Sequence, residues 1–239
     1  MNQTELLKKY LASREEMDIH DHGYPFVTIS RQVGAGGHSL GREIIRQLDA
    51  QKDEGWNHGW DLFDQKLCAM LAQDPATQAS FESLLKEEFK DEFNQIFYEM
   101  FIGKAEQYTL QKRIAAVVRF LGYIGRTVII GRGGMCVTRD MRPGVHVRLV
   151  AAEEYRIPRM MEALESSREQ AVAEMHKQDR ERASAVRTLY GKDSSDPLLY
   201  DMVLNTGTLD NAEMAEAVVR LIAARRRMTP IRHPRPFRH

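Results

Sequence analysis

The sequence predicts an α/β fold in which a parallel five-stranded sheet is flanked by helices. Short β-branched and apolar runs alternate along the chain with segments of helical periodicity. A glycine-rich loop directly follows the first of these runs. The chain has 239 residues, which suits one α/β domain with an insertion. Strands that alternate with helices form parallel sheets with right-handed crossovers and helices on both faces.

Five strands are predicted from short apolar runs that lie between turn residues or polar segments. The first, FVTIS, directly follows Pro25 and is rich in β-branched residues. The five predicted strands lie at 26–30, 60–63, 127–130, 145–150 and 200–204.

Helices are predicted where apolar residues recur at steps of three and four. Asp64 is placed to cap a helix over 65–72. Within the long helical stretch 153–190, Ser167 and Gln170 form a capping box at which a new helix begins. Asp210 and Glu213 open a last helix that ends near residue 227. The other predicted helices lie at 4–17, 39–50, 80–101 and 104–124.

The chain divides into three predicted parts. Residues 1–25 form an N-terminal extension, 26–227 form the domain, and 228–239 form a flexible basic tail that is rich in proline and arginine. Inside the domain, 80–125 is expected to be a helical insertion, because no strand separates its helices, and 153–192 a helical lid.

The composition limits the classes of partner. Lys and Arg balance Asp and Glu at 34 each, which disfavours nucleic acid, although the basic tail leaves contact with RNA or acidic lipid open. Two distant cysteines give no disulfide framework or zinc site. No signal peptide or membrane-length apolar run is found, so a cytoplasmic protein without a membrane partner is expected. The apolar stripe of 81–100 suits either the core or a dimer contact, so monomer and homodimer both stay open.

The loop after the first strand is the most informative segment. Glycines let backbone N–H groups approach an anion closely, and the next helix adds its unpaired N–H groups and positive dipole end. We therefore expect this loop to bind phosphate, although an ordinary glycine-rich turn is the alternative. The expected binding residues are Gly34, Ala35, Gly36, Gly37, His38 and Ser39.

The loop departs from the Walker A pattern G-x-x-x-x-G-K-[ST]. If Gly36 takes the place of the second glycine, Gly37 stands where the lysine belongs and Arg31 stands at the first glycine. That lysine normally contacts the transferred phosphates. Arg31 is the nearest guanidinium that could replace part of its role, and Ser39 could supply a hydroxyl for Mg²⁺.

The segment 29–37, ISRQVGAGG, resembles the "ISR-x-x-G-S-G-G" opening of the cytidylate kinase-like family. Further segments resemble that family in the same order, and the whole covers roughly residues 26–222: they are 128–134, 147–156 with Arg159, 179–183, and 200–206 with Leu209. The resemblance implies a P-loop NTPase type of fold. It also implies nucleotide substrates, with transfer of the ATP γ-phosphate, assisted by Mg²⁺, to a nucleoside monophosphate such as CMP or dCMP.

The same resemblance implies roles for individual side chains. Arg31 and the lid arginines Arg156, Arg159 and Arg182 would stabilise the migrating charge. The acceptor would be positioned by Asp64, Arg132 and Asp179. Each assignment has a plainer alternative: a solvated helix face with i, i+3 and i, i+4 pairs for the lid residues, a helix cap for Asp64 and a turn arginine for Arg132.

Two departures from the family lie on the acceptor side. Cytidylate kinases carry an Arg-Asp pair where Met175 and His176 stand, and "GRD" where this chain has Gly131-Arg132-Gly133. Together with the missing lysine, they leave a second function open, that of a catalytically degenerate nucleotide-binding or regulatory protein.

Overall fold

The computed structural model describes residues 24–52, 54–73, 106–131 and 133–228. The predicted helices at 4–17 and 80–101, Arg132 and the tail beyond residue 228 lie outside these ranges. The division into an extension, an insertion, a lid and a tail stays a prediction.

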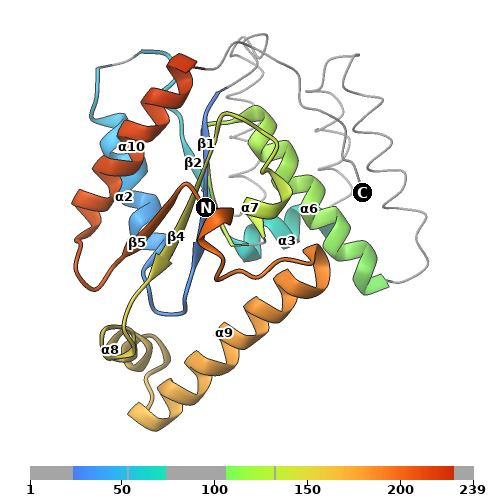
Figure 1. Cartoon of the computed structure of the whole chain (residues 1–239), viewed down its shortest axis with the longest axis vertical. Helices are drawn as coiled ribbons and strands as arrows, with labels where there is room; N and C mark the ends of the chain where they lie inside the picture. The colour runs from blue at the N-terminus through green and yellow to red at the C-terminus, as the bar shows by residue number, and fades with distance from the viewer. Residues whose placement is uncertain (1–23, 53, 74–105, 132, 229–239) are drawn as a thin grey trace.

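A parallel sheet of five strands forms the centre of the described chain (Figure 1). The strand order is β2-β3-β1-β4-β5, and every neighbouring pair is parallel. The predicted fold class is confirmed, and each strand begins and ends within two residues of its expected bounds. The strands are β1 Phe26–Arg31, β2 Asp61–Phe63, β3 Thr127–Ile130, β4 Gly144–Val150 and β5 Met202–Asn205.

Helices cover both faces of the sheet (Figure 1). On one face, α2 (Gly37–Asp49) and α10 (Asn211–Met228) pack on alternate strand residues such as Val27 and Ile29. On the other face lie α3 (Gln65–Gln73), α6 (Glu106–Ile124) and α7 (Gly134–Val137). The two buried clusters account for the apolar periodicity of the helices, since burying each large apolar side chain stabilises the fold by about 1.5–3 kcal/mol.

A helix pair, α8 (Glu153–Leu164) and α9 (Arg168–Tyr190), lies beyond the carboxyl end of β4 (Figure 1). The expected capping box separates them: the Ser167 hydroxyl accepts a hydrogen bond from the Gln170 amide, and the Gln170 side chain accepts one from Ser167 N. The helix pair therefore lies at the carboxyl edge of the sheet, where ligands bind in open α/β folds.

Two other predicted helix starts, at Asp64 and Asp210, are also confirmed. Asp64 Oδ1 accepts a hydrogen bond from Leu67 N at 2.9 Å, and Asp210 and Glu213 each accept one from the backbone N–H of the other. Two short elements were not predicted, α7 and the 3₁₀ turn η1 (Pro197–Leu199). Neither is long enough to show a helical period in the sequence.

Candidate active site

The glycine loop connects β1 to α2 at the carboxyl edge of the sheet. Gly36 is the N-cap of α2 and has φ +84°, and Gly34 has φ +79°, a conformation that side chains other than glycine rarely adopt. A Cβ atom added at Gly34 would lie 2.9 Å from the carbonyl oxygen of Arg156. Glycine is therefore required there for the loop to pack directly against α8.

A buried ion pair fastens the helix pair to this loop. Asp179 Oδ1 accepts a hydrogen bond from Val33 N at 2.8 Å, and Asp179 Oδ2 lies 2.6 Å from Arg156 Nη1. Arg156 Nη1 also donates to the Val33 carbonyl oxygen at 3.2 Å, and Arg156 is only 4% exposed. The structure thus gives these two residues a role in positioning α8 and α9 on the loop. Their predicted contacts with substrate stay predictions.

Arg159 lies on the exposed side of the same helix. Its guanidinium lies over the Tyr155 ring at 4.2 Å, and its Nη2 donates to the Tyr155 hydroxyl at 2.6 Å. A Cβ atom added at Gly36 would lie 3.1 Å from Arg159 Nη1. An exposed positive charge therefore stands directly beside the cap of α2, where an anion on the loop would be bound.

Arg31 links the glycine loop to the end of β3. Its side chain passes Gly37, since an added Cβ there would lie 3.4 Å from Arg31 Cδ. It ends beside Gly131, where an added Cβ would collide with Arg31 Nη1. Because Gly37 and Gly131 have no side chains, space is left between them for this guanidinium. The role of Arg31 in binding phosphate stays a prediction.

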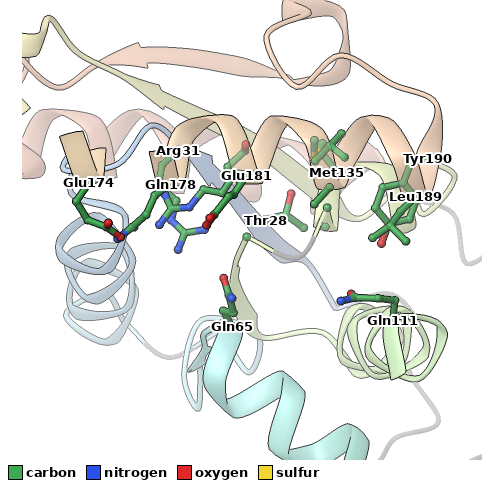
Figure 2. A pocket seen from close by; sticks show the side chains of 17 residues that line it. Thr28, Arg31, Gln65, Gln111, Met135, Glu174, Gln178, Glu181, Leu189 and Tyr190 are labelled. Carbon is green, nitrogen blue, oxygen red and sulfur yellow. The ribbon is translucent and has the colours of Figure 1, made fainter. Parts of the chain in front are cut away.

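A cavity of about 380 Å³ opens next to Arg31, between the strand ends and α9 (Figure 2). Figure 2 shows Gln65 and Gln111 on one side of it and Gln178 and Glu181 on the other. Sequence reasoning did not find these four residues, because amides and carboxylates on helices are usually solvated. Their position in one cavity depends on packing between α3, α6 and α9. Its further lining residues include Thr28, Ser30, Gly131, Gly133, Gly134, Met135 and Arg182.

Arg182 is the second cation of this cavity. Its Nη1 is buried and has no hydrogen-bond partner in the described part of the chain. Burial lowers the pKa of the Arg182 guanidinium, and the nearby charge of Asp179 opposes that shift. An unsatisfied buried donor carries a free-energy cost of about 1–3 kcal/mol, which a ligand oxygen would remove. The cavity therefore combines two arginines with the carboxylates of Glu174 and Glu181, and Arg182 leaves a donor for a ligand oxygen.

His38 and Asp64 contact each other at the start of α2. Their Nε2 and Oδ2 atoms lie 3.3 Å apart. Counted from Gly36, His38 stands at the hydroxyl position of the Walker A pattern, and Ser39 lies one residue beyond it. Ser39 is exposed, and its assignment to Mg²⁺ stays a prediction.

The described residues contain no group of three or more His, Cys, Asp or Glu side chains arranged to hold a metal ion. Mg²⁺ in nucleotide sites takes most of its ligands from phosphate and water, with only one or two from protein. The residues present therefore fit a nucleotide-borne Mg²⁺ better than an ion held by the protein alone.

The pH dependence of stability can test the hydrogen bonds that Asp64 makes with Leu67 N and His38. Burial of the carboxyl opposes ionisation, but hydrogen bonds from Leu67 N and His38 lower the pKa of Asp64 overall. A lowered pKa in the folded state adds stability above the unfolded pKa of about 3.9, and this stability is lost as the pH falls through the folded pKa.

We expect Asp64→Asn, which keeps a capping oxygen, to lower the free energy of unfolding at pH 7 by about 0.5 kcal/mol, since the carboxylate is partly screened by solvent. The difference from wild type should shrink as the pH approaches about 3 in urea unfolding. Asp64→Ala removes the cap as well and should cost about 1 kcal/mol more than Asp64→Asn at every pH. A cost of Asp64→Asn that does not change with pH would contradict this account.

A comparison with protein families shows to which family the chain belongs. The sequence model of the cytidylate kinase-like family matches residues 26–208. The chain belongs to this family. The match includes the glycine loop, both arginines of the cavity and the helices α8 and α9, and it suggests a kinase-like activity on nucleotides. The resemblance read from the sequence and the P-loop type of fold are thereby confirmed.

One solved structure supports the fold of this cytidylate kinase-like protein, and a second is less similar. An uncharacterized protein from Eubacterium ventriosum ATCC 27560 aligns with a TM-score of 0.63 and 16% identity, over 84% of this chain and 99% of that one. Shikimate kinase from Bacteroides thetaiotaomicron aligns with a TM-score of 0.43 and 15% identity, over 84% and 97%. The comparison with curated proteins finds no match. None of the described helices is both long and apolar enough to cross a membrane.

Proposed function

We propose that this protein transfers the γ-phosphate of ATP to a nucleoside monophosphate, CMP or dCMP, with Mg²⁺ as cofactor. The observation that supports the proposal best is the unpaired, buried N–H of Arg182 in a cavity that also contains Arg31 and adjoins the glycine loop. Phosphoryl transfer depends mainly on positive charge and positioning, and this arrangement supplies both at the carboxyl edge of the sheet.

In this proposal the two phosphate groups lie on either side of Arg31. The loop amides and the first turn of α2 bind the donor phosphates, with Arg159 beside Gly36. The acceptor occupies the cavity, where Arg182 binds its phosphate and the amides of Gln65 and Gln111 offer both donors and acceptors. An acceptor phosphate oxygen attacks the γ-phosphorus, the bond to the β–γ bridging oxygen breaks, and ADP leaves. Mg²⁺ neutralises charge on the donor phosphates.

A coupled assay of ADP release tests the proposal directly. ATP and Mg²⁺ are supplied with each nucleoside monophosphate in turn, and with no acceptor as the control. We expect release above the control with a small set of acceptors, and fastest with CMP or dCMP. Release that is no faster with any monophosphate than without one would contradict the kinase proposal.

A second candidate function is supported by a separate observation. Gly37 stands in place of the lysine that normally contacts the transferred phosphates, and the carboxylate of Asp179 already accepts the Val33 amide of the loop. Both features favour a catalytically degenerate protein that binds nucleotide and regulates another process. ATP binding by calorimetry without any ADP release would select this candidate. A cytoplasmic location and a monomer or homodimer stay predictions under either function.

A further inference from the structure

A second cavity of about 380 Å³ lies on the same face of the sheet as α7, away from the glycine loop. His146 of β4 lines it, together with Asp201, which directly precedes β5. Arg139 and Arg142, in the loop between α7 and β4, and Arg225 of α10 also line it. None of these residues belongs to the site of the proposed function.

The side chain of His146 is the buried polar group of this cavity. The residue is 6% exposed, and its Nδ1 lies 2.8 Å from Thr28 Oγ1. Nε2 makes no hydrogen bond to any residue that the structure describes. Burial lowers the pKa of His146 to about 4; Asp201 opposes this shift, and Arg225 and Arg139 add to it. The ring is therefore neutral at pH 7. When the Thr28 hydroxyl donates to Nδ1, the ring proton lies on Nε2 and can be donated to a ligand.

Positive charge surrounds this imidazole. Among the described lining residues, Asp201 is the one carboxylate, and it is already satisfied: one oxygen pairs with Arg225, and the other accepts from His146 N at 2.7 Å. Arg139 makes one hydrogen bond within the described chain, to the Leu198 carbonyl oxygen at 3.1 Å. Arg142 is exposed and makes no hydrogen bond or ion pair with a described residue. Donors thus remain on two guanidinium groups, which are well suited to phosphate oxygens.

We propose that this cavity binds a small phosphate monoester. Its phosphate accepts hydrogen bonds from Arg139, Arg142 and His146 Nε2, and its organic part lies against the apolar side chains of Met141 and Leu199. A tetrahedral phosphate suits donors that come from three residues, and a cavity of this size is typical of small-ligand sites. The bond from His146 to Thr28, which lines the first cavity, joins the two sites through one hydrogen bond.

The test is an NMR titration of the full-length protein with phenyl phosphate, followed on the imidazole signals of His146. His146→Gln identifies these signals by their loss. We expect a saturable shift with a dissociation constant below about 10 mM, and at least tenfold weaker binding of inorganic phosphate, which lacks the organic part. Arg182→Ala should leave the titration unchanged, which separates this site from that of the proposed function.

Arg142→Ala is the decisive variant, because Arg142 has no partner among the described residues whose loss would disturb the fold. We expect it to weaken phenyl phosphate binding about tenfold. Arg180→Ala, which removes an exposed arginine without a described partner from α9, is the matched control and should change nothing. The proposal is wrong if His146 does not respond to phenyl phosphate, if Arg142→Ala binds as tightly as wild type, or if inorganic phosphate binds equally well.

Discussion

Arg182→Ala is expected to lower turnover on the accepted monophosphate by about a hundredfold. The buried Nη1 of Arg182 has no partner among the described residues, so a phosphate that carries developing charge would be its strongest acceptor. The dissociation constant of ATP should stay within about twofold of wild type, because ATP is expected to bind on the other side of Arg31. Single-turnover kinetics and calorimetry measure the two quantities separately.

Two further variants sharpen this prediction. Arg182→Lys should restore only part of the rate, because an ammonium group lacks the planar pair of donors that a guanidinium offers. Arg180→Ala lies on the same helix but on its exposed side, and should leave turnover unchanged. If Arg182→Ala weakens ATP binding while turnover at saturation is normal, Arg182 binds the donor in the ground state and the transition-state role is excluded.

Asp179→Ala is expected to lower the free energy of unfolding by about 3 kcal/mol, at the low end of the cost of breaking a buried ion pair. The variant leaves the Arg156 guanidinium, which is 4% exposed, without its carboxylate. It also removes the hydrogen-bond acceptor of Val33 N. Asp179 itself is about a quarter exposed, which limits the loss. Urea unfolding followed by circular dichroism measures the effect.

The chain offers a matched control for this experiment. Arg168 and Glu154 form a second ion pair between α9 and α8, at 2.7 Å, but both side chains are at least half exposed. Arg168→Ala should therefore cost less than about 0.5 kcal/mol. Equal costs for Asp179→Ala and Arg168→Ala would mean that the buried pair does not fasten the helix pair to the loop.

The fold could be predicted from the sequence because its signals are local. Strand runs, capping residues and the glycine loop each lie within a few residues of one another, and the structure places them as expected. Asp64 shows this well, since its cap depends only on the backbone N–H of Leu67, three residues later. Parallel pairing then follows from the alternation of strands and helices.

The site was predicted less completely because it depends on contacts between distant residues. Arg156 lies in a helix whose charge pattern suggests a solvated face, yet it is buried by contacts with Val33 and Asp179. Gln65 and Gln111 belong to helices that meet only in the folded protein, and no local pattern distinguishes them from solvated amides.

The central place of β1 in the sheet has a consequence for how the chain folds. Val27 pairs with Val128 on one side and with Val145 on the other, so both partners of β1 are synthesised about a hundred residues after it. Until then, both edges of an apolar strand are unpaired, a state that slows folding and favours association between chains. The glycine loop that follows β1 receives its anchor even later, from Asp179. Of the described elements, β1 is synthesised first, and it is thus among the last to reach its native pairing.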